Sequence, residues 1–433
     1  MREEGGGTPF LPRARQLDLS RMDNVTHSLA GLVLAESAVQ LRARRSGELP
    51  APRFRAVAAI SSMVAANLPD FDLLYTGAGG DRLAYMLHHR GYTHTVVVAA
   101  AGALLLWGIT WLVWRWRAGA APARDDARWL LGLLLVNTLG HVLLDWTNSY
   151  GVHPFWPFDN RWRYGDAVFI VEPWFWVVAV PVLVAASTRR VARVLLALVL
   201  ALGLVLAWRV PLVARGAAVA LTVGAALSIL IAWRLRPGAR AAFAVGAWVA
   251  VTLVLAAGAS VARAATARAV RDADPGGTLL DVVVTPLPAN AVCASVLTVE
   301  RSGASYRVAT ARVSSLPSVT EASRCGTRER AGALRRHSPR RSTAAVQWDA
   351  EWTAPVAELA TLARESCPAL AALRFIRVPI WRALDPSRVM LGDVRFGSAT
   401  GQGFSDVQVP RRSRECPPAM SPWVPPRAEL LWK

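Results

Sequence analysis

The sequence lacks the short motifs that mark many hydrolases and nucleotide-binding enzymes. It has no HExxH, no GxSxG and no Walker-type phosphate loop. Cysteine is absent before Cys293, so the longer N-terminal part of the chain has no thiol nucleophile. Residues 1–21 have no apolar core of a secretory signal and are expected to be disordered, with Met22 a candidate for the natural start. Any chemistry must come from residues dispersed along the chain.

Acidic residues are scarce relative to basic ones, and nearly all of the basic residues are arginine. The chain has 49 Lys+Arg and 30 Asp+Glu, which gives a formal net charge of +19. Such a charge suits nucleic acid or anionic lipid as a partner. Much of it, however, lies in short loops between apolar runs, where membrane topology explains it more simply. We therefore predict membrane lipids as partners and no nucleic acid.

Long apolar runs dominate the first two thirds of the chain. The sequence is 53% hydrophobic, and its mean hydropathy is +0.31. Many of its 18 Trp lie near the ends of these runs, as in the aromatic belt of a membrane protein. About 20 residues span the bilayer core, so we expect an α-helical polytopic membrane protein with about eight transmembrane or half-membrane helices. The runs lie near 25–41, 54–66, 95–114, 129–145, 167–187, 191–208, 210–233 and 241–262.

The run at 54–66 is short for a full span, and it is either tilted, re-entrant or packed inside the bundle. Arginine clusters follow the first, third, fifth and seventh runs, at 42–55, 115–128, 189–193 and 234–240. The positive-inside rule puts these loops in the cytoplasm. The other loops then face outward, and with eight crossings so does the C-terminal region.

The character of the chain changes after about residue 272. DADPGG is typical of a linker, and TLLDVVVTPLP, ASVLTVERSG and ASYRVATARV read as short alternating strands. An even number of cysteines in an outward-facing domain predicts up to two disulfides, with four free thiols as the alternative. The cysteines are Cys293, Cys325, Cys367 and Cys416.

We thus expect four parts in the chain. They are a disordered extension, 1–21; a membrane domain with the polar motifs, 22–180; further transmembrane helices, 181–271; and a soluble β-rich extracytoplasmic domain, 272–433.

Six of the seven histidines lie in the first 153 residues, and the predicted topology puts all six at the outer ends of the helices. Acidic residues accompany them. Ionisable groups at membrane depth are costly and usually functional, so their gathering on one side predicts a single site. The residues are His27, His88, His89, His94, His141 and His153, with Asp23, Asp70, Asp72, Asp145, Asp159, Asp166 and Glu172.

Two pairs among these residues have the spacing of a helical metal site. His141 and Asp145 lie four residues apart on one helical face, which suits a divalent ion. Asp23 and His27 repeat the spacing, although Asp23 or its neighbour Asn24 could equally cap the first helix.

The other candidates need a turn to come together. Asp70 and Asp72 cannot share a helical face, so we expect a loop or an extended stretch there. His89 and His94 are about 140° apart on an ideal helix. They converge only if the chain turns between them, which Gly91 permits.

Several features also have a purely structural reading. A lone histidine at a helix end is usually an interfacial polar residue, and this is the reading for His88 and His153. The stretch 146–176 carries eleven aromatics in 31 residues. It is an interfacial loop on the bilayer, a lid beside the site, or both.

Read together, the motifs resemble a known family. MDNVTHSLAGLVLAE, NLPDFD, HRGYTHT, GHVLLDWTNSYG and PFDNRWRYGD, followed by DAVFIVEPWFW, are similar in order and spacing to those of the LexA-regulated, membrane-bound metal-dependent hydrolase-like proteins of bacterial inner membranes (the YdjM type). The resemblance covers roughly residues 22–180. It implies an integral inner-membrane protein with a divalent-metal hydrolase site.

The resemblance also assigns positions in this sequence. The family motifs fall on Asp23, His27, Asp70, Asp72, His89, Arg90, Gly91, His94, His141 and Asp145, and later on Asp166 and Glu172. At Glu172 the family pattern leads us to expect Asp, so the carboxylate is kept on a longer side chain.

We predict a membrane-bound hydrolase that uses one or two divalent ions on an ester or phosphoester, either lipid-linked or a small molecule. Zinc fits a His/Asp set best, with manganese or iron as alternatives. Asp70 or Asp72 would be a ligand, a bridging carboxylate or the general base, and Arg90 would stabilise negative charge on the substrate. The candidate ligands are His27, Asp70, His89, His94, His141 and Asp145.

The alternative is a non-catalytic membrane protein that uses the same cluster for metal transport or structural bracing. Transport needs polar residues along a path, and the helices in 167–262 have very few. A structural ion has a closed shell of four ligands, whereas catalysis needs an open position. The sequence alone does not separate bracing from catalysis.

Overall fold

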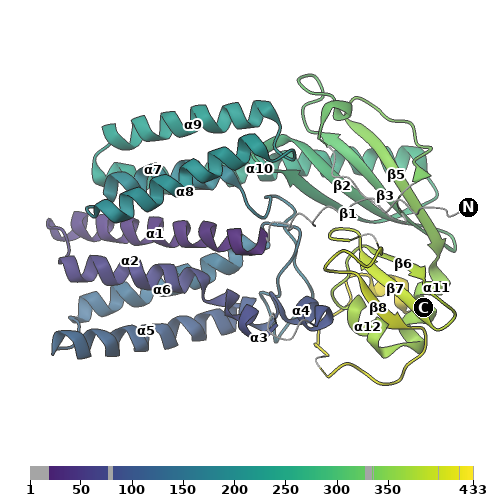
Figure 1. Cartoon of the computed structure of the whole chain (residues 1–433), viewed down its shortest axis with the longest axis horizontal. Helices are drawn as coiled ribbons and strands as arrows, with labels where there is room; N and C mark the ends of the chain where they lie inside the picture. The colour runs from purple at the N-terminus through teal and green to yellow at the C-terminus, as the bar shows by residue number, and fades with distance from the viewer. Residues whose placement is uncertain are drawn as a thin grey trace, which may run out of the picture.

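A computed structural model describes residues 19–76, 81–326, 334, 336–397, 399–418 and 420–432 (Figure 1). A bundle of long helices forms one end of the molecule, and two β-sheet lobes form the other. The first helix begins at Leu19. The predicted disordered extension therefore lies, up to residue 18, outside the described residues.

The eight apolar runs all form helices of the bundle. α5, α6, α8, α9 and α10 are long and apolar enough to cross a bilayer, and α2 with the bent segment after it makes a sixth if that pair is one span. Many leucines and valines on α5, α8 and α10 are exposed, as lipid-facing residues are. The helices are α1 (Leu19–Ser46), α2 (Pro52–Asn67), α5 (Val96–Ala118), α6 (Arg124–Trp146), α7 (Pro173–Ala186), α8 (Arg190–Arg209), α9 (Arg215–Arg234) and α10 (Pro237–Ala273).

The short run at 54–66 forms α2, which packs against α1 and α6 and leaves a face with Ile60 and Val64 exposed. Its Phe54 and Ala58 side chains are completely buried. α1 approaches α2 closely because residue 31 is glycine: a Cβ at Gly31 would lie 2.7 Å from the Ser62 carbonyl oxygen. Beyond α2 the chain bends by 52° into a 3-10 helix, η1 (Pro69–Asp72), and the short α3 (Leu73–Thr76).

α7 is shorter than the apolar run that predicted it. The helix begins only at Pro173, because proline suits the first helical position, and it has 14 residues. It is apolar on every side, and it is buried against α1, α8, α9 and α10, as such a helix should be. The domain boundary expected at residue 180 falls inside this helix.

α10 is longer than expected and links the bundle to the β lobes. It continues past residue 262 to Ala273. The extra turns pack small apolar side chains such as Ala262 and Val270 against Val282 and Val296 of the first sheet. The same helix thus serves first as a membrane span and then as a layer on a sheet (Figure 1).

The C-terminal region is a two-lobed β domain. The three predicted strands form β1 (Thr278–Leu287), β2 (Asn290–Ser302) and β3 (Ser305–Ser314), which join β5 (Val346–Pro355) and β4 (Arg336–His337) in an antiparallel sheet of order β1-β2-β3-β5-β4. The second lobe contains the antiparallel sheet β6 (Pro379–Ala383), β7 (Arg388–Asp393) and β8 (Val407–Pro410), with α11 (Val356–Glu365), α12 (Cys367–Leu373) and α13 (Ala428–Leu431). Each lobe holds one disulfide, Cys293–Cys325 and Cys367–Cys416.

The aromatic stretch 146–176 is mostly a buried junction between the bundle and the second lobe. Tyr150 and Trp162 belong to the same core cluster as the apolar residues of that lobe. Only the tip of the stretch is open, where Phe158 is 89% exposed and Phe155 is 44% exposed. The tip alone suits an interfacial loop.

Asp166 anchors the junction electrostatically. Its carboxylate accepts hydrogen bonds from both terminal nitrogens of Arg377, at 2.8 and 2.9 Å, and from Arg263 on α10 at 2.8 Å. Asp166 and Arg377 are buried. A charge pair of this kind is strongly destabilising when one partner is removed, because the other stays buried without its counter-charge.

We predict that Asp166→Asn lowers the free energy of unfolding by about 3 kcal/mol. The guanidinium of Arg377 then keeps only one of its two carboxylates, that of Asp281. Asparagine tolerates the left-handed backbone of this residue (φ 53°), so the effect is electrostatic. Asp159→Asn is the control: its pair with Arg163 is partly exposed, and its loss should cost less than about 1 kcal/mol. Thermal denaturation in detergent measures both, and equal small effects would rule out Asp166 as an anchor.

Candidate metal centre

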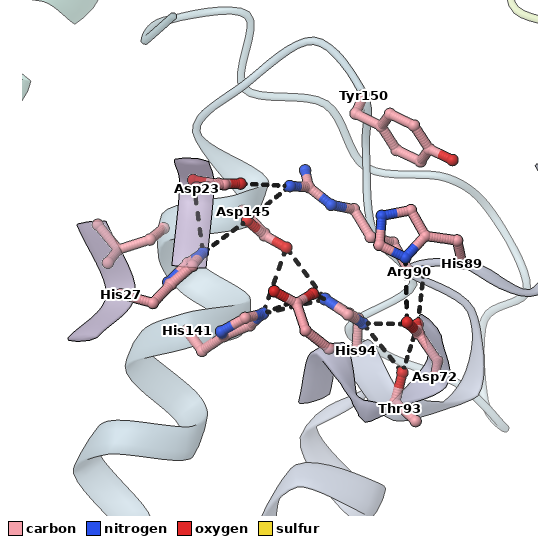
Figure 2. Close-up of polar contacts among 12 residues, drawn as sticks. Asp23, His27, Asp72, His89, Arg90, Thr93, His94, His141, Asp145 and Tyr150 are labelled. Carbon is pink, nitrogen blue, oxygen red and sulfur yellow. Dashed lines mark hydrogen bonds and ion pairs between the residues drawn. The ribbon is translucent and has the colours of Figure 1, made fainter. Parts of the chain in front are cut away.

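The polar residues of the N-terminal motifs gather where the bundle meets the second β lobe (Figure 2). They come from α1, η1, α6 and the turn between α4 (Arg82–His88) and α5, which contains the 3-10 helix η2 (Tyr92–His94). None of the eight predicted site residues is more than 9% exposed. These residues are His27, Asp70, Asp72, His89, Arg90, His94, His141 and Asp145.

Four potential ligand atoms converge at the centre of this cluster. His94 Nε2 lies 3.0 Å from His141 Nε2, 3.0 Å from Asp145 Oδ2 and 3.4 Å from Asp70 Oδ1. His141 Nε2 lies 3.5 Å from Asp70 Oδ1 and 3.4 Å from Asp145 Oδ2. An ion bound tetrahedrally with bonds of about 2.0 Å separates its ligand atoms by about 3.3 Å. The spacing therefore fits one small divalent ion.

The hydrogen bonds on the far side of each imidazole set its tautomer. His141 Nδ1 lies 2.6 Å from the carbonyl oxygen of Ala66, which can only accept. Thr93 donates its hydroxyl to Asp72 at 2.9 Å, so its oxygen accepts from His94 Nδ1 at 3.0 Å. In the neutral rings both Nε2 atoms then carry lone pairs that face each other. Such lone pairs repel unless a cation lies between them.

The two carboxylate oxygens that face these nitrogens accept no hydrogen bond. Asp70 Oδ1 and Asp145 Oδ2 are buried and lack a hydrogen-bond partner among the described residues. Buried acceptors of this kind are rare and call for an ion or a water. Asp70, His94, His141 and Asp145 thus fit a divalent metal by distance, by tautomer and by unmet bonding capacity.

Asp72 orients the histidine turn. Its Oδ1 lies 3.0 Å from His89 Nδ1, and its Oδ2 accepts from the Arg90 backbone N–H at 2.9 Å and from Thr93. Asp72 lies in a 3-10 helix rather than in the expected loop or extended stretch. Three residues per turn set residues 70 and 72 about 120° apart. Asp70 therefore reaches His94 and His141, while Asp72 reaches His89.

The chain turns between His89 and His94, as the sequence predicts. The left-handed residue is Arg90, with φ 58°, whereas Gly91 has φ −84° and ψ −114°. Glycine is nevertheless needed, because a Cβ at residue 91 would lie 2.9 Å from the His88 carbonyl oxygen. The turn brings His89 and His94 together on opposite oxygens of Asp72.

Arg90 links three elements of the site. Its Nη2 lies 2.8 Å from Asp23 Oδ2 and 3.0 Å from Asp145 Oδ1, and its Nη1 donates to Asn148 at 3.1 Å. Its guanidinium also lies over the Tyr150 ring, 5.0 Å from the centroid. Sequence reasoning did not single out Asn148 or Tyr150, although both stand in the motif WTNSYG beside Asp145.

Asp23 and His27 lie well inside α1, which begins at Leu19, so Asp23 and Asn24 do not cap this helix. His27 Nε2 lies 3.3 Å from Asp145 Oδ1 and 3.7 Å from Asp23 Oδ1. The His27 ring also stacks on His141, with centroids 3.8 Å apart.

The remaining candidates lie outside the four-atom set. The His88 ring stacks on Tyr92. Glu172 caps α7 and accepts from the backbone N–H groups of Trp174 and Ala289, both at 3.1 Å, and burial raises its pKa to about 7. His153 is packed between Trp162 and Trp423, with ring centroids 3.8 and 3.7 Å away, and burial lowers its pKa to about 3. Asp166 and Glu172 thus serve the junction.

We predict that His153 makes the fold acid-sensitive. Its pKa is about 3 in the folded protein and about 6.5 in the unfolded chain, so the unfolded state binds the proton first. Stability is then lost as the pH falls below about 6.5, by about 1.4 kcal/mol per pH unit. Thermal denaturation at pH 7 and pH 5 should show His153→Phe, which keeps an aromatic ring there, losing about 2 kcal/mol less than the wild type. An unchanged pH response would contradict this.

Comparison with known proteins finds a match for one region of the chain. Residues 22–213 match the model of the YdjM inner membrane protein family. No curated protein and no solved structure matches the chain. The matched region contains all four converging ligands and the Asp72 and Arg90 contacts around them, whereas the β domain lies beyond it. With its apolar helices, this region makes the chain a multi-pass membrane protein, and residues 22–213 are similar to the YdjM inner membrane protein family.

Proposed function

We propose that the protein is a membrane-bound, metal-dependent hydrolase of an ester or phosphoester. The observation that supports it most is the convergence of lone-pair atoms of Asp70, His94, His141 and Asp145 at 3.0–3.5 Å, because one divalent cation would satisfy them together. Structural zinc sites are usually built with cysteine, whereas histidine–carboxylate sets are typical of hydrolytic sites. Zinc suits the set best, and manganese or iron are alternatives.

The buried charge supports the same proposal. Asp23, Asp70, Asp72 and Asp145 oppose one guanidinium, Arg90, so four negative charges less one positive leave three when the histidines are neutral. Uncompensated charge is costly away from water. One divalent ion would reduce the imbalance to a single charge.

The neighbouring acidic groups favour one ion over two. Asp23, His27 and Asp145 form a second potential ligand group, but Arg90 Nη2 already lies within 3.0 Å of both carboxylates. In the third group, Asp70, Asp72 and His89, the Asp72 oxygens accept hydrogen bonds from Thr93 and from the Arg90 backbone. In the central set, Asp70 Oδ1 and Asp145 Oδ2 have no such donor among the described residues.

In this proposal the protein's own residues have distinct roles. A divalent ion held here would lower the pKa of a water towards neutrality and polarise the scissile group. Asp72 and Thr93 orient His94, and the Ala66 carbonyl orients His141. Arg90 orients Asp145 and is engaged with protein carboxylates rather than directed at a substrate. His27, which contacts Asp145 without a firm hydrogen bond, is the candidate proton acceptor.

A lipid-linked substrate is favoured by the segment that carries the carboxylates. Asp70 and Asp72 face the site, while Phe71, Leu74 and Tyr75 are 51%, 74% and 57% exposed. The short helices η1 and α3 thus lie between the candidate ligands and an exposed apolar surface that suits lipid. The positive-inside rule supports an extracytoplasmic site and β domain, since the basic connections lie at the other end of the bundle.

A structural metal is the second candidate. Four ligands form a closed shell, and all of them are buried, which is the arrangement of a bracing site. Catalysis would require one ligand to shift or the ion to accept a fifth. Asp70 is the candidate for such a shift, because it is the most exposed of the four residues, at 9%.

We predict that detergent-purified wild type carries about one equivalent of divalent metal. His94→Ala and Asp145→Ala, from two separate motifs, should each lose it, because each removes one of four ligands. His88→Ala is the matched control, since it lies in the same turn but outside the ligand set. Elemental analysis after zinc or manganese loading gives the result. A wild type that binds no metal would show that the cluster is a polar network and would end the hydrolase proposal.

Hydrolysis is tested on the same preparations with ester and phosphoester lipids in vesicles. Turnover by the wild type and by His88→Ala, lost in His94→Ala and Asp145→Ala, would support catalysis. Tightly bound metal with no turnover of any substrate, and no exchange with added cobalt, would favour the bracing role.

We also predict the sidedness of the protein. In a cysteine scan on spheroplasts, an impermeant maleimide should label Ala304→Cys in the exposed turn between β2 and β3. Ala120→Cys, exposed between α5 and α6, should react only after permeabilisation. The reverse pattern would put the site and the β domain in the cytoplasm.

A further inference from the structure

We propose that the C-terminal β domain positions the metal centre, with Trp423 holding the histidine turn and Arg395 holding the segment that follows α6. This inference rests on the proposed function, because it concerns the same ion. Both residues lie outside the region that matches the YdjM family, which ends at residue 213. They therefore add contacts from beyond the matched region to the site.

Trp423 caps the helix that leads into the histidine turn. Its indole Nε1 donates to the Leu87 carbonyl oxygen at 2.7 Å. The last carbonyls of a helix have no partner within it, so this bond satisfies one that α4 leaves open. The Trp423 side chain is only 1% exposed, and its ring lies against Tyr92 and His153. The indole thus touches the turn just before and just after Arg90.

The contact is close enough to constrain the turn itself. A Cβ at Gly91 would lie 3.2 Å from Trp423 Cζ2, so the backbone there has little room to move. Three residues on, His94 presents Nε2 to the ion site. A shift of the turn away from Trp423 would move that nitrogen relative to Asp145 and His141.

Arg395 acts on the other side of the site. Its Nη1 donates to the backbone carbonyls of Ser149 at 2.7 Å and Tyr150 at 3.1 Å, while Asp393 holds the guanidinium at 2.8 Å. Arg395 and Asp393 are buried. The residue before Ser149 is Asn148, whose side chain accepts from Arg90.

These contacts form a path from the β domain to a ligand. Arg395 fixes the backbone at 149–150, Asn148 and Tyr150 hold Arg90, and Arg90 pairs with Asp145 at 3.0 Å. One lobe therefore contacts the segments on both sides of the four-atom set. Partners one step beyond the ligands commonly change metal affinity by about 10- to 100-fold.

The test compares Trp423→Ala with a tryptophan of the same lobe that does not touch the site. Trp381 is also buried, but it packs on Tyr306 and Trp352 and donates to Glu358. We expect zinc affinity of the full-length protein, measured by chelator competition, to fall at least about tenfold in Trp423→Ala. Trp381→Ala should lower the melting temperature but leave zinc affinity within about twofold. Trp423→Phe keeps an aromatic ring but not the N–H group, so its zinc affinity should lie between those of Trp423→Ala and the wild type.

A second readout separates positioning from stability. In cobalt-loaded protein, the visible absorption reports ligand geometry, so it should change in Trp423→Ala and stay unchanged in Trp381→Ala. Arg395→Lys, which keeps a charge beside Asp393 but cannot reach both carbonyls, should weaken zinc binding in the same direction. If Trp423→Ala fails to fold, the zinc affinities and cobalt spectra of Trp423→Phe and Arg395→Lys test the positioning role instead.

The outcomes distinguish this inference from the proposed function. A wild type that binds zinc, with Trp423 and Arg395 variants that bind it equally well and with the same cobalt spectrum, would overturn the positioning role alone. A wild type that binds no ion would overturn both. Equal losses in Trp381→Ala and Trp423→Ala would reduce the effect to general destabilisation and also reject positioning.

Discussion

The guanidinium of Arg90 is the group on which the arrangement of the site depends. It pairs with Asp23 on α1 and Asp145 on α6, and it donates a hydrogen bond to Asn148 just beyond α6. Its backbone N–H binds Asp72 on η1. One residue thus joins its own turn to three other segments: α1, η1 and the end of α6. Its left-handed backbone (φ 58°) is the conformational cost of reaching all of them.

Arg90 also determines where negative charge is left over. It neutralises the Asp23 side of Asp145, so the other oxygen of Asp145 is free to face Asp70, His94 and His141. Asp72, with hydrogen bonds to both oxygens, is satisfied without an ion. The unsatisfied charge is therefore concentrated at one point rather than spread over the cluster. This concentration is what makes a single divalent ion the simplest occupant.

Much of the bundle and of the site could be predicted from the sequence. The apolar runs gave the helices because a lipid environment demands long, uninterrupted segments, and the four-residue spacing of His141 and Asp145 gave one face of the site. The strands β1 to β3 followed from alternation. The left-handed conformation of Arg90 in this turn could not be predicted, because its strain is offset by partners that only the fold brings close. The far end of α10 was missed because small residues there pack on a sheet rather than on lipid.

The contacts of the β domain could not be predicted for a different reason. Trp423 and Arg395 lie more than two hundred residues after the motifs they hold, and nothing in their own neighbourhood signals a partner. Two motif residues nevertheless depend on the β domain for their partners. Asp166 and Glu172 belong to the motif region, yet the groups that bind them, Arg377 and the Ala289 backbone, lie in the β domain. A buried carboxylate in the membrane region that relies on a distant arginine is stable only when both parts have folded. The bundle and the β domain are therefore best understood as one cooperative unit, with the candidate metal centre at their shared boundary.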